Sequence, residues 1–160
     1  MSKISLVILL LVTLTGFAQT TDYSFGRNGA SFVNLYDSVP GLYPFDHDID
    51  AAGNLYIIAN LYIGGSSAQS DQDHIIIKVN AAGKIDSSFF ESGYRSLGHG
   101  IINFFNPWPY GYHPPNFVKV SNDQSRIYVF SNGLSLRLKQ NGQTDSTYGN
   151  NGYVLHPNSS

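Results

Sequence analysis

The sequence predicts an all-β protein built from repeated units, and three observations support this fold class. Only 12% of the residues are charged, whereas 14% are aromatic and 16 are glycine, a composition that suits short strands joined by tight turns. After residue 20, no segment keeps an apolar period of 3.6 residues through three turns, so no amphipathic helix is expected. One short phrase also recurs three times, and a fixed period of that kind governs the whole fold.

The recurring phrase is ten residues long. It reads DYSFGRNGAS from Asp22, DSSFFESGYR from Asp86 and DSTYGNNGYV from Asp145. Successive copies begin 64 and 59 residues apart, and the glycine seven residues after each aspartate keeps the same spacings. The segments between the copies repeat as well, since LYIIAN at 55–60 corresponds to IYVFSN at 127–132. We therefore expect one unit over about 22–85, a second over about 86–144 and the start of a third over 145–160.

Four strands are expected within the first unit, at 32–36, 47–50, 54–63 and 74–80. The turn AAGN at 51–54 joins the second strand to the third, because Gly-Asn tolerates the positive φ of a tight hairpin. The apolar runs at 55–59 and 75–77 do not alternate with polar residues, so both faces of these strands should be covered.

A four-stranded sheet of about 60 residues that is covered on both faces is typical of a β-propeller blade, because each blade stacks between two neighbours. The predicted fold is therefore about two four-stranded antiparallel, blade-like sheets of an incomplete, open β-propeller-type array. The phrase is expected at the junction where one unit passes to the next.

The phrase resembles the delta-60 repeat of secreted bacterial proteins. It is preceded by N-x-x-G-x-I/T and followed by an apolar strand, and the likeness covers nearly all of the mature chain. The residues that carry it are Asp22, Ser24, Phe25, Gly26 and Gly29, then Asp86, Phe89 and Gly93, and finally Asp145, Thr147, Tyr148, Gly149 and Gly152. The middle copy departs from the pattern, with Phe90 where the family has glycine. The resemblance implies a propeller-like β array and brings no catalytic residues.

A structural role explains why such a phrase recurs. The aspartate can accept hydrogen bonds from the backbone amides that follow it, as in an Asx turn. The aromatic residue, which is Phe25, Phe89 or Tyr148, can fill the gap between adjacent sheets, and the glycines permit the bend into the next strand. The alternative is functional, with the three aspartates lining a shared site.

The N-terminus predicts an export signal. Lys3 precedes an apolar run from Ile4 to about Leu14, which ends in small residues at Gly16 and Ala18. A run of about 11 residues is too short to cross a bilayer as a helix, which needs roughly 20. We expect a cleaved signal peptide over 1–18 and a β-repeat domain over 19–160 that is secreted, periplasmic or on the cell surface, without a transmembrane anchor. The alternative is a buried N-terminal helix.

Charge and cysteine content exclude several classes of function. After cleavage the chain has a net charge of about −3, which argues against nucleic-acid binding because that requires a basic surface. The chain contains no cysteine, which excludes thiol catalysis and cysteine-ligated zinc. Its five histidines are scattered and no G-x-S-x-G motif occurs, so no catalytic residues are expected.

The densest acidic cluster places Asp46, Asp48 and Asp50 at alternate positions. Alternate residues of a strand share one face, so the three carboxylates can converge on a calcium ion. The EF-hand pattern fails, because Ala59 stands where a bidentate glutamate is required. The alternative is a solvated strand edge, and no other cofactor is expected.

An aromatic segment at 98–117 is the strongest candidate for ligand binding. It contains Trp108, Tyr110 and Tyr112 together with four prolines, a surface suited to a glycan or to a protein partner. The alternative is that these rings fill the open side of an incomplete array.

Two units cannot close a propeller, since closed rings need at least four blades. Self-association, association with another repeat protein, and a chain shortened from a longer array would each resolve this. We expect an exported, non-enzymatic β-repeat module that serves in binding or scaffolding. The alternatives are a truncated fragment without independent activity and a polysaccharide-active surface enzyme.

Overall fold

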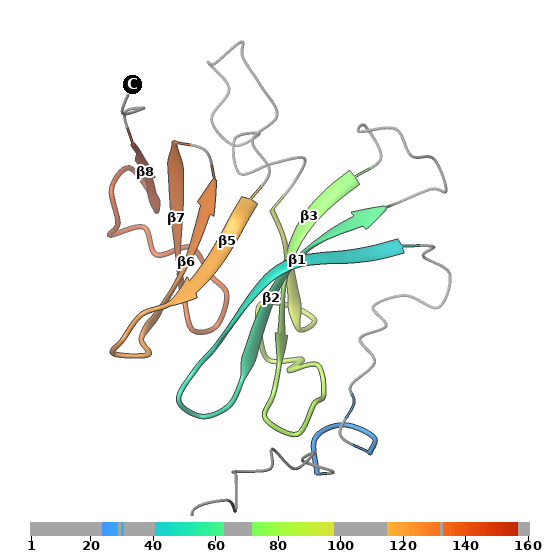
Figure 1. Cartoon of the computed structure of the whole chain (residues 1–160). Helices are drawn as coiled ribbons and strands as arrows, with labels where there is room; N and C mark the ends of the chain where they lie inside the picture. Colours follow the sequence, from blue (N-terminus) through green and yellow to red (C-terminus); the bar gives the residue numbers. More distant parts are fainter. Residues whose placement is uncertain are drawn as a thin grey trace, which may run out of the picture.

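The computed structural model describes residues 24–28, 30, 41–62, 72–97, 115–131 and 133–156, which contain two four-stranded antiparallel sheets (Figure 1). Sheet 1 consists of β1 (Gly41–Ile49), β2 (Leu55–Tyr62), β3 (Gln72–Val79) and β4 (Tyr94–Ser96). Sheet 2 consists of β5 (Pro115–Val120), β6 (Arg126–Ser131), β7 (Leu134–Lys139) and β8 (Tyr153–Leu155). In each sheet every strand pairs with the next one along the chain. The described residues include no helix, and the predicted all-β class with two four-stranded sheets is confirmed.

The sheets are offset by one strand from the predicted units. The predicted strand 47–50 is the end of β1, while 54–63 and 74–80 correspond to β2 and β3. The fourth strand of sheet 1 is β4, which begins in the last two residues of the phrase, whereas the predicted strand 32–36 lies outside the described residues. The phrase therefore connects the third and fourth strands of one sheet and does not join two sheets. β4 pairs antiparallel with β3, with Tyr94 opposite Ile77, and most of the phrase lies between these two strands.

The predicted hairpin between β1 and β2 is confirmed. The amide of Gly53 donates to the carbonyl of Asp50 at 3.0 Å, and Gly53 has a φ of 82°. The amide of Asp50 in turn donates to the carbonyl of Asn54 at 2.9 Å, which closes the turn.

The predicted Asx turn is present in the two copies of the phrase that the structure describes in full, at 86–95 and 145–154. The Oδ1 atom of Asp86 accepts a hydrogen bond from the amide of Ser88 at 3.1 Å. In the same way, Oδ1 of Asp145 accepts from the amide of Thr147 at 3.2 Å. The two connections between the third and fourth strands thus fold alike, which supports the repeat as the unit of structure.

A left-handed backbone conformation explains why glycine recurs at the eighth position of the phrase. Gly93 and Gly152 have φ angles of 88° and 100°, and a Cβ atom would lie 2.2 Å from Ile85 Cγ2 or 2.1 Å from Thr144 Cγ2. Phe90 also has a positive φ, 53°, although a bulky residue in this region costs about 1 to 3 kcal/mol. The backbone shape of the phrase is therefore kept even where glycine is replaced.

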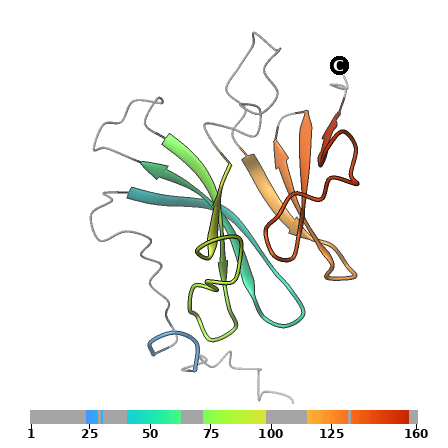
Figure 2. The ribbon, with the colours of Figure 1, turned by 180° about the vertical axis from the view of Figure 1, so that it is seen from behind.

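Two layers of apolar side chains lie on the two faces of sheet 1. The layer between the sheets is lined by Tyr56, Ile58, Ile76, Phe89 and Leu97 on one side and by Val118, Val120, Ile127, Val129, Leu134, Leu136 and Leu138 on the other. The layer on the opposite face of sheet 1 contains Ala59, Leu61, Ile75, Ile77 and Val79. The view from behind shows the two sheets side by side (Figure 2). The prediction that β2 and β3 are covered on both faces is thus confirmed for their central residues.

Phe89 fills the gap between the two sheets, as predicted for the aromatic residue of the phrase. Its side chain is 1% exposed, and its ring meets Tyr56 edge to face with 6.0 Å between centroids. On the other side, the ring lies 3.0 Å from the position that a Cβ atom would take at Gly142. Phe89 therefore touches both sheets.

Replacing Phe89 tests this arrangement. Phe89→Ala should lower the free energy of unfolding by roughly 3 to 5 kcal/mol, because it leaves a cavity between the sheets. Phe90→Ala is the matched control: its ring is 40% exposed, so we expect a change of about 0.5 kcal/mol or less. Urea unfolding followed by circular dichroism measures both, and equal effects would contradict the assignment of Phe89 as the inter-sheet residue.

Candidate functional site

Of the three aspartates predicted as a calcium site, Asp46 and Asp48 lie on one face of β1 and Asp50 lies in the turn after it, and each has a partner in the protein. Oδ2 of Asp46 accepts a hydrogen bond from the amide of Val118 at 2.9 Å, and Oδ2 of Asp48 accepts from the amide of Val120 at 2.8 Å. Asp48 also pairs with Lys119 at 3.2 Å. These carboxylates therefore satisfy amides on the free edge of β5, as a neighbouring strand would.

Asp50 holds the hairpin after β1. Its carboxylate accepts hydrogen bonds from the amides of Ala52 and Asn54 at 3.0 and 2.8 Å, and from the Tyr56 hydroxyl at 3.2 Å. Burial alone would raise the pKa of Asp50, yet the hydrogen bonds from Asn54 and Tyr56 hold it below its usual range. Among the described residues, no group of three or more His, Cys, Asp or Glu side chains is arranged to hold a metal ion.

The two phrase aspartates that the structure describes, Asp86 and Asp145, do not share one site. Asp86 pairs with Lys78 at 2.8 Å within sheet 1, whereas Asp145 pairs with Arg126 and Arg137 within sheet 2. Other predicted residues cannot be placed, since Asp22, Gly29 and the aromatic candidates Trp108, Tyr110 and Tyr112 all lie outside the described residues.

The side of sheet 2 that faces away from sheet 1 is the surface most suited to binding. Along β6, Ile127 and Val129 are buried against sheet 1, while Tyr128 and Phe130 alternate with them and are only half-buried. We call this side the outer face, and its principal residues are Phe117, Arg126, Tyr128, Phe130, Arg137 and Tyr148. It was not anticipated from the sequence.

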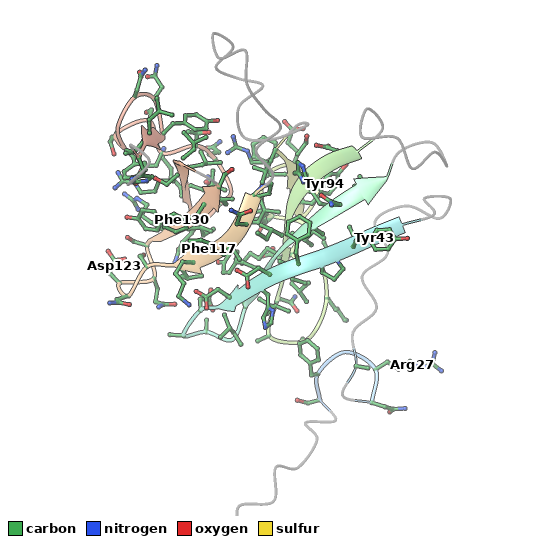
Figure 3. All side chains as sticks on the ribbon, turned by 45° about the horizontal axis from the view of Figure 1, so that its top comes forward. Arg27, Tyr43, Tyr94, Phe117, Asp123 and Phe130 are labelled. Carbon is green, nitrogen blue, oxygen red and sulfur yellow. The ribbon has the colours of Figure 1, made fainter. Side chains whose placement is uncertain are left out.

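Four aromatic rings form a row across the outer face. Phe117 stacks on Phe130 with 4.6 Å between centroids, and Phe130 stacks on Tyr128 at 6.1 Å. Tyr148 meets Tyr128 edge to face at 5.7 Å, and the guanidinium of Arg137 lies 4.6 Å from the centre of the Tyr148 ring. Figure 3 shows Phe117 and Phe130 next to each other, with Asp123 at the end of the β5–β6 hairpin.

A hollow of about 450 Å³ lies beside this row. It is lined by Ser121, Asn122, Asp123, Ser125, Arg126, Tyr128 and Arg137. Hydrogen bonds from Ser121 and Ser125 lower the pKa of Asp123 to about 2. The hollow therefore combines two cationic side chains with an ionised carboxylate at its rim.

Asp145 forms ion pairs with both arginines of the outer face, so one carboxylate is shared between two guanidinium groups and a net positive charge remains. Its Oδ2 atom lies 2.6 Å from Nε of Arg126 and 3.0 Å from Nε of Arg137, and its side chain is buried. The hydrogen bond from the Thr147 hydroxyl, together with that from Arg126, holds the pKa of Asp145 well below its usual range against the opposing effect of burial. This carboxylate is consequently ionised throughout the neutral range.

The outer face is the counterpart, position by position, of the face of sheet 1 that sheet 2 covers. Tyr128, Phe130, Ser135 and Tyr148 occupy the positions of Tyr56, Ile58, Ile76 and Phe89. The sheet 1 residues are at most 1% exposed, whereas Tyr128, Phe130 and Tyr148 are half-buried. One signal for this was in the sequence: LSLRLK at 134–139 alternates apolar and polar residues, while the corresponding strand of sheet 1 contains the unbroken apolar run at 75–77.

Comparison with known protein families, with curated proteins and with solved structures finds no match to this chain. Within the described ranges there is also no helix of a length and hydropathy suited to crossing a bilayer.

The ion pairs of Asp145 predict a dependence of stability on pH. Because its folded pKa is depressed, the stability it contributes is present above its unfolded pKa, about 3.9, and is lost as the pH falls below that value toward the folded pKa. Asp145→Asn should thus be less stable than the wild type near pH 7, and the difference should shrink as the pH falls below about 4. Urea unfolding across this pH range measures it.

Glu91→Gln is the control for the change in net charge, since Glu91 is an exposed carboxylate in the equivalent connection of sheet 1. A difference between the wild type and Asp145→Asn that stays constant with pH would contradict the ion-pair assignment.

Proposed function

We propose that the protein is an exported, non-enzymatic β-repeat module that acts by binding or scaffolding, with the outer face of sheet 2 as its binding surface. The observation that carries this proposal is the relation between the two sheets. The outer face repeats a face that is fully buried in sheet 1, yet it presents a row of half-exposed aromatic rings and a charged hollow. Exposed aromatic groups with arginine beside them are typical of protein-binding surfaces.

The proposal includes the architecture expected from the delta-60 resemblance, a propeller-type array of blades. Three observations support it: both sheets are four-stranded meanders, they pack face to face, and their phrases fold alike at spacings of 64 and 59 residues. Export rests on the predicted signal peptide over 1–18.

The direction of the pKa shifts of the described carboxylates favours binding over catalysis. A glycosidase needs one carboxyl group with a raised pKa as its general acid. Among the described carboxylates whose pKa is shifted, every shift is downward: Asp48, Asp50, Asp86, Asp123 and Asp145. Each of them also accepts hydrogen bonds that support a turn, a strand edge or an ion pair. These groups therefore act as structural acceptors, which supports a non-enzymatic module.

The test compares two phenylalanines of similar exposure. Phe117 on the outer face is 47% exposed and Phe90 is 40% exposed. Phe117→Ser should weaken binding of the mature chain to a cell-surface fraction of the producing organism by about tenfold, the loss typical of a central aromatic residue, while Phe90→Ser should leave it unchanged. Saturable binding measured by biolayer interferometry decides between them.

Equal losses in the two variants, or no saturable binding by the wild type, would overturn the outer face as the binding surface. Release of sugars from the same fraction by the purified wild-type chain would overturn the non-enzymatic assignment and favour a polysaccharide-active enzyme.

A further inference from the structure

The first copy of the phrase covers a turn of sheet 1. The amide of Gly26 donates to the carbonyl of Ala82 at 2.9 Å, in the turn that follows β3. Phe25 packs against the apolar layer on that face of sheet 1, and a Cβ atom at Gly83 would lie 2.5 Å from the Gly26 nitrogen. The blue segment in Figure 1 shows this stretch below the loops of sheet 1. We call residues 24–28 and 30 the N-terminal cap.

The second copy makes the same contact with sheet 2. The amide of Phe90 donates to the carbonyl of Asn141 at 2.7 Å, and the ring of Phe89 lies against Gly142. Phe90 follows Gly26 by 64 residues and Asn141 follows Ala82 by 59, the two spacings of the phrase itself. The repeat therefore contains a recurring inter-layer contact, in which a phrase binds the turn after the third strand of the next sheet.

The third copy has the shape required for this contact. Gly149 has a φ of 52°, close to the 59° of Gly26 and the 53° of Phe90. The amide of Tyr148 donates to the carbonyl of Asp145 at 3.0 Å, as the amide of Phe89 does to Asp86 at 2.9 Å. Among the described residues, however, no turn is stacked on Tyr148 and Gly149, which lie on the outer face and at its margin.

We propose that the outer face and the third phrase of one copy of this chain dock on sheet 1 of a second copy, on the 80–83 turn that the N-terminal cap of that second copy covers. This inference rests on the outer face being the binding surface, and it assigns the occupant. Both halves of the contact are present in one chain: the third phrase is the donor, and the turn with Ala82 and Gly83 is the acceptor.

The burial of the cap favours its displacement. Phe25 is only half-buried, whereas Phe89, its counterpart between the sheets, is 1% exposed. The other described residues of the cap are exposed. The cap thus buries less of its aromatic ring than the inter-sheet contact does, so a complete outer face can compete for the same turn.

The contact between two copies is expected to be weaker than the contact between the two sheets of one chain, because the outer face lacks some of the linking side chains of sheet 1. Within one chain, three polar side chains link sheet 1 to sheet 2. Asp46 and Asp48 accept hydrogen bonds from two amides of β5, those of Val118 and Val120. Arg95 donates to the carbonyl of Gly142 and to the hydroxyl of Thr144. On the outer face the corresponding positions hold Phe117, Lys119 and Val154. None of them can replace the carboxylate acceptors or the guanidinium donor of sheet 1. The cap is also tethered to the turn that it covers, which raises its effective concentration. The wild type is therefore mainly monomeric, and association depends on opening of the cap.

Two docked copies can form a closed assembly. Docking of an outer face on sheet 1 is a head-to-tail contact, which either closes a ring or grows a filament. Two copies bring together four sheets, the smallest number that closes a propeller. A closed dimer is therefore the expected product.

The experiment weakens the cap and measures association by sedimentation velocity of the full mature chain. Phe25→Ala should strengthen self-association by about tenfold over the wild type, because apparent affinity scales with the fraction of uncapped molecules. Adding Tyr148→Ala to this variant should reverse the gain. Adding Tyr43→Ala, which removes an exposed ring on the opposite side of β1 from the cap, should leave the gain intact.

The outcomes separate this inference from the proposed function. A monomeric, folded Phe25→Ala protein overturns the second copy as the occupant, and so does association that persists when Tyr148→Ala is added. If such a monomer still binds the cell-surface fraction through Phe117, the proposed function stands and the outer face has another partner. If binding is lost as well, both proposals fail.

Discussion

The arrangement of the two sheets depends on one buried contact, the ring of Phe89 against the turn that contains Gly142. The ring is held on its own side by the turn that Asp86 stabilises, so contacts within sheet 1 fix its direction toward the second sheet. Arg95 then reaches across to the carbonyl of Gly142 at 2.7 Å and to the hydroxyl of Thr144 at 2.8 Å. Since the amide of Phe90 also binds Asn141, the turn is fixed at its backbone as well as through side chains. Packing and hydrogen bonding thus select the same relative position of the sheets.

The parts of the fold that were predictable from the sequence are those encoded locally. An aspartate two residues before a serine or threonine specifies an Asx turn, and unbroken apolar runs such as 75–77 specify strands with two covered faces. The strand β4 was missed because YRS is short and partly polar, with no period to reveal it. The role of Asp46 was missed for a different reason. Alternation gives the face on which a carboxylate lies, but its partner, Val118, is 72 residues away along the chain.

The offset between sequence unit and sheet has a structural consequence. Because the phrase lies inside a sheet and its aromatic ring projects toward the next layer, successive copies contribute to successive layers. Phe25 packs on one face of sheet 1, Phe89 lies between the sheets, and Tyr148 lies on the outer face. A single motif therefore generates a stack, since each copy completes the apolar layer of the unit that follows it. Nearest-neighbour contacts of this kind are the basis of stability in repeat proteins.

The differences in sequence between the outer face and the equivalent face of sheet 1 explain how the outer face can be stable while partly exposed. Ile76 and Phe89 of sheet 1 are matched by Ser135 and Tyr148: Tyr148 keeps the aromatic ring of Phe89 and adds a hydroxyl, while Ser135 puts a small hydroxyl side chain in place of the larger isoleucine. These hydroxyls bond to each other at 2.8 Å, and Ser135 lies 2.8 Å from Nε2 of His156. The hydroxyls of Ser135 and Tyr148 are thus satisfied within the sheet, so these two groups cost little whether the face is exposed or covered. An apolar face would favour permanent packing and a charged one would favour solvent. An aromatic row in which the Tyr148 hydroxyl is bonded internally is suited to a contact that forms and dissociates.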